Sequence, residues 1–506
     1  MNHSIIFPVL IPLLIAILQL LPPLSGRGGL ASGRLRASSL FAVGLVLVVA
    51  VYLLLATHSG AAQIYRLGDW QPPFGIVLVA DRLAALMLLV TAVLALGALL
   101  YACAGDDHTG VYFHPLFLFQ LAGINAAFLT GDLFNLFVAF EILLIASYAL
   151  LIHGGGKART RVAVGYVILN LVGSTVFLFA LGILYGVLGT LNMADMAVKI
   201  RHLSSAEQAI ASTGGLLLLV VFGLKSAMLP LQFWLPATYA AASAPVAALF
   251  AILTKVGIYS MLRVFGLIFG PHAGALADLI VPWLWPLAVL SLLLAAVGIM
   301  AAVSLRQLIG QLILLSIGTL LAAMAINNTA AVGAALYYLV HSTLICGALF
   351  LLADIVVRQR GKAEDRFVQA QRMCHPGLLG TVFFVAALSV VGLPPLSGFV
   401  GKALMLNAAE TSAQISWLWP PILLGGLASL VALSRAGSTL FWRISGEKAC
   451  CEPVSRLQLA AVLLLLSASP LLVLFGGPVT GFTGASAEQL ALFERTPQLL
   501  LPQVSP

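Results

Sequence analysis

Charged residues are scarce in this 506-residue chain. Asp, Glu, Lys and Arg make up 8% of the sequence, against about 25% in a typical soluble domain. Hydrophobic residues make up 61%, which excludes a soluble globular fold. Because a membrane-spanning helix needs about 20 apolar residues, the length allows roughly a dozen to fourteen spans and leaves almost nothing for a soluble domain.

Several motifs are also missing. The five cysteines include no C-x-x-C spacing, so we predict neither a disulfide framework nor a zinc ribbon and treat them as structurally neutral. The net charge of +8 is spread over many loops, which argues against a basic face for nucleic acid. A haem held within the membrane needs facing axial ligands, but only one histidine, His341, lies in the middle of a predicted span. These absences argue against direct redox catalysis.

Apolar runs bounded by charge, proline or glycine predict an all-α polytopic membrane protein with about fourteen transmembrane helices. The first run lacks a basic region and a small-residue cleavage site, so we expect it to be retained as a helix. The predicted spans are 4–22, 38–57, 82–103, 113–130, 133–152, 162–188, 213–229, 246–267, 279–303, 308–326, 331–353, 379–409, 416–434 and 457–476.

Lysine and arginine residues indicate the orientation. The loops after odd-numbered spans hold sixteen of them, from Arg27 to Arg456, and the opposite side holds six. By the positive-inside rule, the odd-span loops are cytoplasmic. We therefore expect a multi-pass protein of the bacterial cytoplasmic (inner) membrane with both termini outside.

Ionisable residues inside the predicted spans are the strongest functional signal. Lys225, Lys255, Lys402 and Glu141 all fall within spans, together with His341. A charge in the middle of the bilayer costs at least about 2.5–3.5 kcal/mol, and such residues mark ion and proton pathways. This pattern argues against a purely structural subunit.

Other ionisable residues lie near predicted span ends. We expect Arg263 and Arg435 to reach the membrane surface by snorkelling. Four acidic residues are expected to be solvated at helix ends: Asp81, Asp132, Asp354 and Glu410. The sequence therefore gives these six residues a solvated, structural interpretation.

Two predicted spans are interrupted by proline. In the seventh, Lys225 precedes Pro230, and in the twelfth, Pro394 and Pro395 precede Lys402. Proline lacks an amide hydrogen and clashes with the preceding turn, so both helices should be broken within the membrane. Because the breaks lie five spans apart and an odd offset inverts topology, we predict two inverted five-helix repeats. The predicted regions are an N-terminal three-helix region at 1–110, repeats at 111–270 and 271–436, and a C-terminal helix and tail at 437–506.

Three stretches resemble the antiporter-like subunit family shared by respiratory complex I, membrane-bound hydrogenases and Mrp-type multisubunit cation/proton antiporters. They are DLFNLFVAFE, PLQFWLPATYAAASAPVAALFAILTKVGIY and GLPPLSGFVGK. The resemblance implies a proton path across the middle of the membrane. It implies that Glu141 and Lys225 form a coupled pair, that Lys255 is the central relay, that His341 is a link, and that Lys402 is the terminal group.

Departures from the family pattern narrow the resemblance. Where complex I relatives often have a WLPDAH-like string, this chain has WLPATY at 234–239. The residue four positions after His341 is Ile345 instead of a lysine, and Lys402 stands where the complex I subunit of closest length would be expected to have a glutamate. The strings ATYAAASAP and GLPPLSGFVGK are instead similar to the D subunit of Mrp-type antiporters.

The resemblance implies a proton-translocating subunit of a multisubunit Na⁺(K⁺)/H⁺ antiporter, which is an ion transporter and not an enzyme, without cofactor or metal. The alternative is a proton-pumping membrane subunit of a complex I-like or hydrogenase-linked respiratory complex. The expected partners are other membrane subunits of the same complex, protons, monovalent cations and the lipid bilayer, with no nucleic acid.

Overall fold

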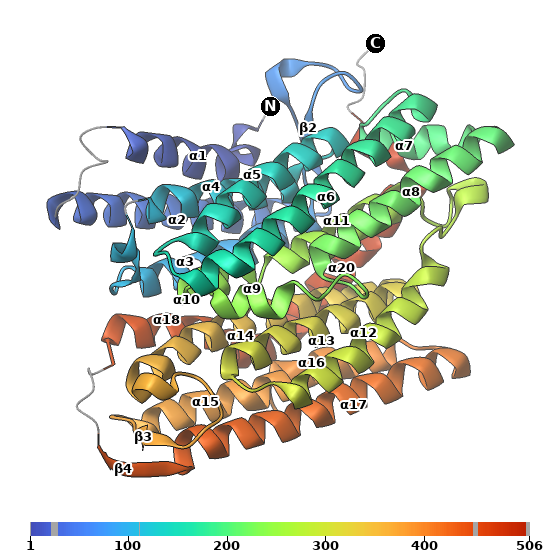
Figure 1. The fold of residues 1–506 in the computed structure, drawn as a ribbon. Coiled ribbons are helices and arrows are strands. Elements are labelled where there is room, and N and C mark those ends of the chain that lie inside the picture. Colours follow the sequence, from blue (N-terminus) through green and yellow to red (C-terminus); the bar gives the residue numbers. More distant parts are fainter. Residues whose placement is uncertain (1, 22–28, 111, 449–453, 502–506) are drawn as a thin grey trace.

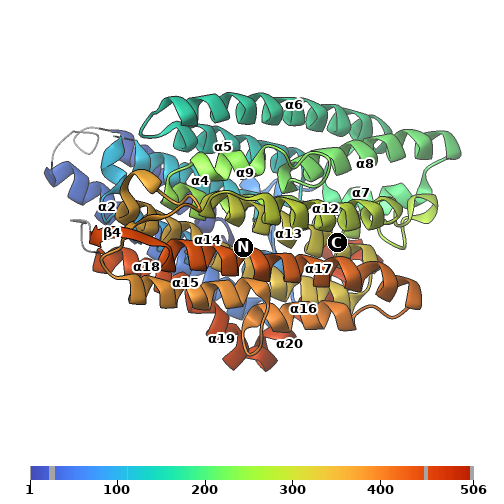
Figure 2. The same ribbon diagram turned by 60° about the horizontal axis from the view of Figure 1, so that its bottom comes forward.

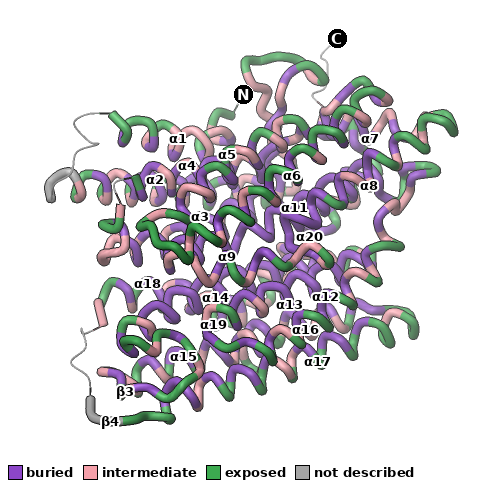
Figure 3. The backbone as a smooth tube through the Cα atoms, in the orientation of Figure 1, coloured by how far each residue is buried: buried purple, intermediate pink, exposed green. Residues whose placement is uncertain are grey.

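A computed structural model describes residues 2–21, 29–110, 112–448 and 454–501 of the chain. Arg27, Cys450 and Cys451 lie outside these residues. The described chain is mostly helical, and its long helices run side by side along one direction (Figures 1 and 2). Figure 3 shows buried residues concentrated on the central helices and exposed residues along the outer ones.

Helices account for all fourteen predicted spans. Eleven segments in the described part of the chain are long and apolar enough to cross a membrane, and three shorter apolar helices cover the others. Short polar side chains begin several of them; Asp132, for example, accepts a backbone hydrogen bond of 2.8 Å from the amide of Asn135. The first three are α1 (Phe7–Leu20), α2 (Gly29–Ala56) and α3 (Arg82–Ala102).

Two sets of five crossings follow. The first consists of α4 (Phe113–Leu129), α5 (Leu133–Ile152), α6 (Lys157–Leu188), α8 (Ser205–Ser226) with α9 (Leu235–Ala241), and α10 (Ala244–Phe250) with α11 (Leu253–Leu267). The short helix α7 (Met193–Lys199) lies between α6 and α8. The second consists of α12 (Val281–Ala301), α13 (Leu305–Ile326), α14 (Thr329–Arg360), α15 (Pro376–Val391) with α16 (Ser397–Asn407), and α17 (Ser412–Gly437). The exact region boundaries at 110, 270 and 436 stay predictions.

The two sets run in opposite directions through the membrane. Asp106, just before α4, accepts a 2.6 Å hydrogen bond from Arg358 near the end of α14. Asp354, also in α14, accepts one of 2.6 Å from Arg306 at the start of α13. The side on which α4 begins is therefore the side on which α12 ends, as inverted repeats require.

The predicted breaks in the seventh and twelfth spans are confirmed. The chain leaves helical geometry between α8 and α9 and again between α15 and α16. Ala227 ends α8 in the left-handed region with a φ of 58°, and Gly392 ends α15 in the same region with a φ of 83°. Both spans thus carry non-helical backbone between two helical halves.

Two further breaks differ from the prediction. The span at 246–267, expected to be continuous, is interrupted at Ala251 and Ile252, and the hydroxyl of Tyr239 donates a 2.7 Å hydrogen bond to the carbonyl of Phe250. The last crossing does not end at 476. It continues through α18 (Arg456–Leu466), α19 (Ala468–Leu474) and α20 (Gly476–Arg495). Pro470 lacks the amide hydrogen that would continue α18, which accounts for the interruption.

Both described chain ends lie on one side of the membrane layer. Asn2 donates a 2.7 Å hydrogen bond to Gln63, and Gln489 of α20 donates one of 2.8 Å to the carbonyl of Gly60. The antiparallel strands β1 (Gln63–Arg66) and β2 (Val77–Ala80) lie at this side. Which side faces the cytoplasm stays a prediction from the charge pattern.

The parallel strands β3 (Ala370–Arg372) and β4 (Ile444–Lys448) lie at the opposite side. Cys374, shortly after β3, is disulfide-bonded. The treatment of the cysteines as structurally neutral is therefore wrong for this residue.

The interpretation of Arg263 and Asp81 as solvated residues is wrong. Two nitrogen atoms of the Arg263 guanidinium lie 2.5 and 2.8 Å from the two carboxylate oxygens of Asp81, and neither side chain is more than 5% exposed. Burial of both charges is possible because the fork geometry of arginine matches a carboxylate. The pair joins the start of α3 to α11.

Asp132 and Asp354 are likewise buried, so their solvated interpretation is also wrong. Asp354 accepts hydrogen bonds from Tyr101, Arg306 and Arg358, and thus ties α3, α13 and α14 together. In the neighbouring loop, burial raises the pKa of Asp106 to about 6, with Asp354 adding to this effect and Arg358 opposing it.

We predict that Asp81→Asn destabilises the protein by about 3–5 kcal/mol, because it leaves the Arg263 charge buried without its anion. The matched control is Asp69→Asn, since Asp69 pairs with Arg66 at 2.7 Å but its side chain is 64% exposed; it should cost no more than about 1 kcal/mol. Unfolding of the detergent-purified protein by added sodium dodecyl sulfate measures both. Equal effects of the two substitutions would contradict the structural role of the buried pair.

Candidate functional site

The five predicted site residues lie on helices that contact one another in series. Consecutive members of the set α5, α6, α8, α11, α13, α14 and α16 all pack together. Each of the three lysines lies within six residues of a break: Lys225 is the penultimate residue of α8, Lys255 is the third of α11, and Lys402 is the sixth of α16. These lysines and His341 are buried, and Glu141 is half-buried.

Glu141 and Lys225 are connected through α6. Ser174 donates a short hydrogen bond to the Glu141 carboxylate, and Lys225 Nζ donates one of 3.1 Å to Asn170 Oδ1. Asn170 and Ser174 are one helical turn apart and therefore share a face of α6. No ion pair joins the described side chains of Glu141 and Lys225. Each is instead hydrogen-bonded to a polar residue on the same face of α6.

Lys255 lies between the two repeats. Its Nζ donates a 3.2 Å hydrogen bond to the hydroxyl of Ser316 in α13. On its other side, α11 approaches the end of α8 so closely that a Cβ on Gly257 would lie 2.7 Å from the amide nitrogen of Ser226. The glycine therefore brings the backbone regions that carry Lys225 and Lys255 together.

His341 belongs to a cluster of hydroxyl groups that the sequence did not indicate. Its Nδ1 lies 2.7 Å from the hydroxyl of Ser397, the first residue of α16. Ser469 of α19 lies 2.9 Å from the Ser397 hydroxyl and 3.1 Å from that of Ser389 in α15. We call Ser389, Ser397 and Ser469 the serine cluster. The sequence feature that could have indicated this cluster is Ser469, a serine next to Pro470 within an apolar run.

Lys402 closes the break in the twelfth span. Its Nζ donates hydrogen bonds to the carbonyls of Val390 and Val391 at 3.3 and 2.8 Å. These are the last residues of α15, whose carbonyl groups have no partner within the helix. A cation at a helix C-terminus is also stabilised by the helix dipole. The free carbonyl groups at the end of α15 and the ammonium group of Lys402 therefore stabilise each other.

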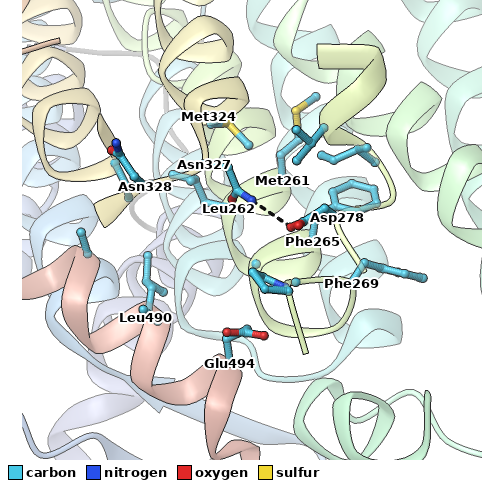
Figure 4. Close-up of a pocket in the computed structure, with 18 of the residues that line it drawn as sticks. Met261, Leu262, Phe265, Phe269, Asp278, Met324, Asn327, Asn328, Leu490 and Glu494 are labelled. Atoms are coloured by element: carbon cyan, nitrogen blue, oxygen red, sulfur yellow. Dashed lines mark hydrogen bonds between the residues drawn. The ribbon is translucent and has the colours of Figure 1, made fainter. Parts of the chain in front are cut away.

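A cavity of about 160 Å³ lies near the C-terminal end of α20, between α11, α12 and the junction of α13 and α14 (Figure 4). Asp278 at its edge accepts a 2.8 Å hydrogen bond from Asn327, and Glu494 lies 2.7 Å from His272 Nδ1. Both carboxylates therefore have partners. Among the described residues, no group of three or more His, Cys, Asp or Glu side chains is arranged to hold a metal ion.

A family model for the transmembrane part of NADH:quinone oxidoreductase and Mrp antiporters matches residues 130–429. The chain belongs to this family. It is 39% identical to a protein of Rhizobium meliloti named as the probable D subunit of a K⁺/H⁺ antiporter, over 97% of this chain and 96% of that protein. It is also 39% identical to the D subunit of a Na⁺/H⁺ antiporter from Bacillus subtilis, over 92% and 93%.

Solved structures in the family share the fold over nearly the whole chain. A chain of the Mrp complex from Dietzia sp. DQ12-45-1b aligns with a TM-score of 0.87 at 25% identity, covering 99% of this chain and 100% of that one. A chain of respiratory complex I from Thermus thermophilus aligns with a TM-score of 0.79 at 24% identity, covering 96% and 99%. The chain therefore has the antiporter-like fold, and its similarity to the two antiporter D subunits makes it an ion-transporter subunit.

We predict that Gly398→Ala destabilises the protein by about 1–3 kcal/mol through overpacking. An added Cβ would collide with the carbonyl of Ser389 and lie 2.9 Å from His341 Nε2. Gly377→Ala in α15 is the matched control, because nothing lies within 4 Å of its added Cβ. The same detergent unfolding assay measures both, and an unchanged stability of Gly398→Ala would show that the break packs loosely around His341.

Proposed function

We propose that this chain is the proton-translocating D subunit of a multisubunit antiporter that exchanges Na⁺ or K⁺ for protons. The similarity to two antiporter D subunits over almost their entire length supports this proposal. The similarity to a chain of an Mrp complex supports the presence of other membrane subunits as partners. The complex I neighbour at 24% identity supports the shared fold alone, so the respiratory alternative has less support.

The observation that carries the proposal is the row of buried polar groups on helices packed in series. It starts at Glu141 and Lys225, passes Lys255 between the repeats, and ends at His341 and Lys402. Ionisable groups at this depth are expensive to bury. Their retention on neighbouring helices supports a proton path running parallel to the membrane plane.

The hydrogen-bond partners suit groups that gain and lose protons. The hydroxyl of Ser316 can accept from a charged Lys255 ammonium or donate to its neutral amine, because a hydroxyl has both a donor and acceptor lone pairs. The serine cluster can likewise serve either tautomer of His341. No direct hydrogen bond joins Lys225 to Lys255 or Ser316 to His341 among the described residues, so we assign proton transfer across these intervals to water molecules.

The proposed orientation is that of a protein of the bacterial inner membrane. It places β3, β4 and the ion network of Asp354, Arg306 and Arg358 at the cytoplasmic side and both termini outside. The excess of lysine and arginine in the loops on the β3 side supports it. The proposed regions remain 1–110, 111–270, 271–436 and 437–506, with both repeats contributing to one path.

Transport in everted vesicles tests the proposal. In a host without its own antiporters, an ATP-driven pH gradient should collapse when NaCl or KCl is added to vesicles holding the complete complex. Glu141→Ala and Lys225→Ala should abolish this exchange while assembly is retained, since each removes one member of the coupled pair. Lys255→Arg should also abolish it, because a guanidinium keeps its proton.

The exposed Lys157, replaced by alanine, is the matched control and should exchange normally. Normal exchange by Glu141→Ala or Lys225→Ala would contradict the pair, and normal exchange by Lys255→Arg would contradict proton release at that residue. Cation-driven exchange requires no electron donor, so activity seen only during respiration would favour the complex I-like alternative.

A separate prediction concerns Ser469. We expect Ser469→Ala to lower the initial rate of exchange at least tenfold, because this hydroxyl contacts both Ser389 and Ser397 beside His341. Ser467→Ala is the control, since its hydroxyl bonds only the carbonyl of Leu464 in its own helix. If both variants exchange at the rate of the unaltered complex, the serine cluster has no part in the path.

A further inference from the structure

A groove of about 760 Å³ lies between α15 and α17. These two helices lie on the side of the molecule far from the first repeat (Figure 1). Its α15 wall is one helical face, with residues from Gly377 through Phe384 to Val391 at spacings of three and four. Its other wall is a matching face of α17 that continues into the π-helical turn η7 (Ser438–Trp442). The groove therefore follows two helices from one membrane surface toward the middle.

Glycine makes this groove hollow. Nothing lies within 4 Å of a Cβ placed on Gly377, and the nearest atom to one on Gly380 is 3.6 Å away in the ring of Phe441. A side chain at Gly377 would enter open space, and one at Gly380 would lie in van der Waals contact with Phe441. The remaining wall residues are mostly apolar, among them Leu388, Leu430 and Leu433.

The mouth of the groove is basic. Arg372 of β3 lines it, and Arg443 stands between the lining residues Trp442 and Ile444. Both arginines are exposed, whereas Arg306 and Arg358 on the same side are held in ion pairs with Asp354 and Asp106. Trp442 is 78% exposed, and tryptophan side chains are enriched at the level of the lipid headgroups.

We propose that this groove binds one anionic phospholipid. Its phosphate would interact with Arg372 and Arg443 and one acyl chain would lie along α15 as far as Val391. Basic pockets between membrane helices at the cytoplasmic surface suit anionic headgroups, and an apolar slot of this size suits a hydrocarbon chain. The positive charge of the two exposed arginines at the mouth of the groove favours an anionic headgroup over an uncharged occupant. The proposal rests on the groove, its charges and the orientation given under Proposed function, and it does not depend on the proton path.

Spin-labelled lipids provide the test. The complete complex is placed in phosphatidylcholine nanodiscs with a trace of phosphatidylglycerol or phosphatidylcholine labelled near the end of one acyl chain. The immobilised fraction should be larger for phosphatidylglycerol. Arg372→Ala with Arg443→Ala should weaken that preference by roughly fivefold per arginine, and Gly380→Leu should remove the immobilised component by filling the groove.

The matched control removes two exposed cations from the same membrane side, Lys157→Ala with Arg161→Ala, and should leave the preference unchanged. An equal loss in this control would show general surface attraction and overturn the site. An unchanged immobilised fraction in Gly380→Leu would also overturn it. Loss of another subunit from purified Gly380→Leu complex would identify a protein helix as the occupant and overturn the lipid assignment.

Discussion

Hydrocarbon offers no hydrogen bonds, and this constraint governs the whole structure. Each interrupted helix frees backbone groups that must find partners inside the protein. Lys402 fills this need at Val390 and Val391, and the hydroxyl of Tyr239 does so at Phe250. The same constraint explains why the buried Arg263 is held in a two-pronged pair with Asp81. At these breaks and at this ion pair, polar groups within the membrane are therefore matched to partners.

Such polar contacts also connect the two repeats. Lys255 comes from the first repeat, and its hydroxyl partner Ser316 comes from the second. The serine cluster adds the last crossing to this arrangement, because Ser469 reaches both halves of the broken twelfth span. The proposed path thus draws on residues from Glu141 to Ser469 of the 506-residue chain.

Local sequence signals predicted the architecture well, and contacts between distant residues account for the errors. The breaks near Pro230 and Pro394 were predictable because proline acts on its own turn. The break after Phe250 depends on Tyr239 in another helix, so no pattern within 246–267 could indicate it. Arg263 was misread for the same reason, since its partner Asp81 lies 182 positions away.

The candidate site shows the same contrast between residues that local sequence indicates and residues that only contacts between distant segments reveal. Charge within apolar runs singled out Glu141, the lysines and His341, because a single ionisable residue in such a run is conspicuous. Serine is common in membrane helices, where its hydroxyl bonds the backbone of its own helix. Apart from the neighbouring proline, nothing in the run around Ser469 therefore distinguished a serine that contacts two other helices.

Helix α14 is unbroken over 32 residues, a rod roughly 48 Å long at 1.5 Å per residue. It carries His341 beside the serine cluster and, further along, Asp354 and Arg358 in the ion network at the β3 side. One continuous helix therefore connects the polar contacts in the middle of the membrane to the salt bridges at its surface.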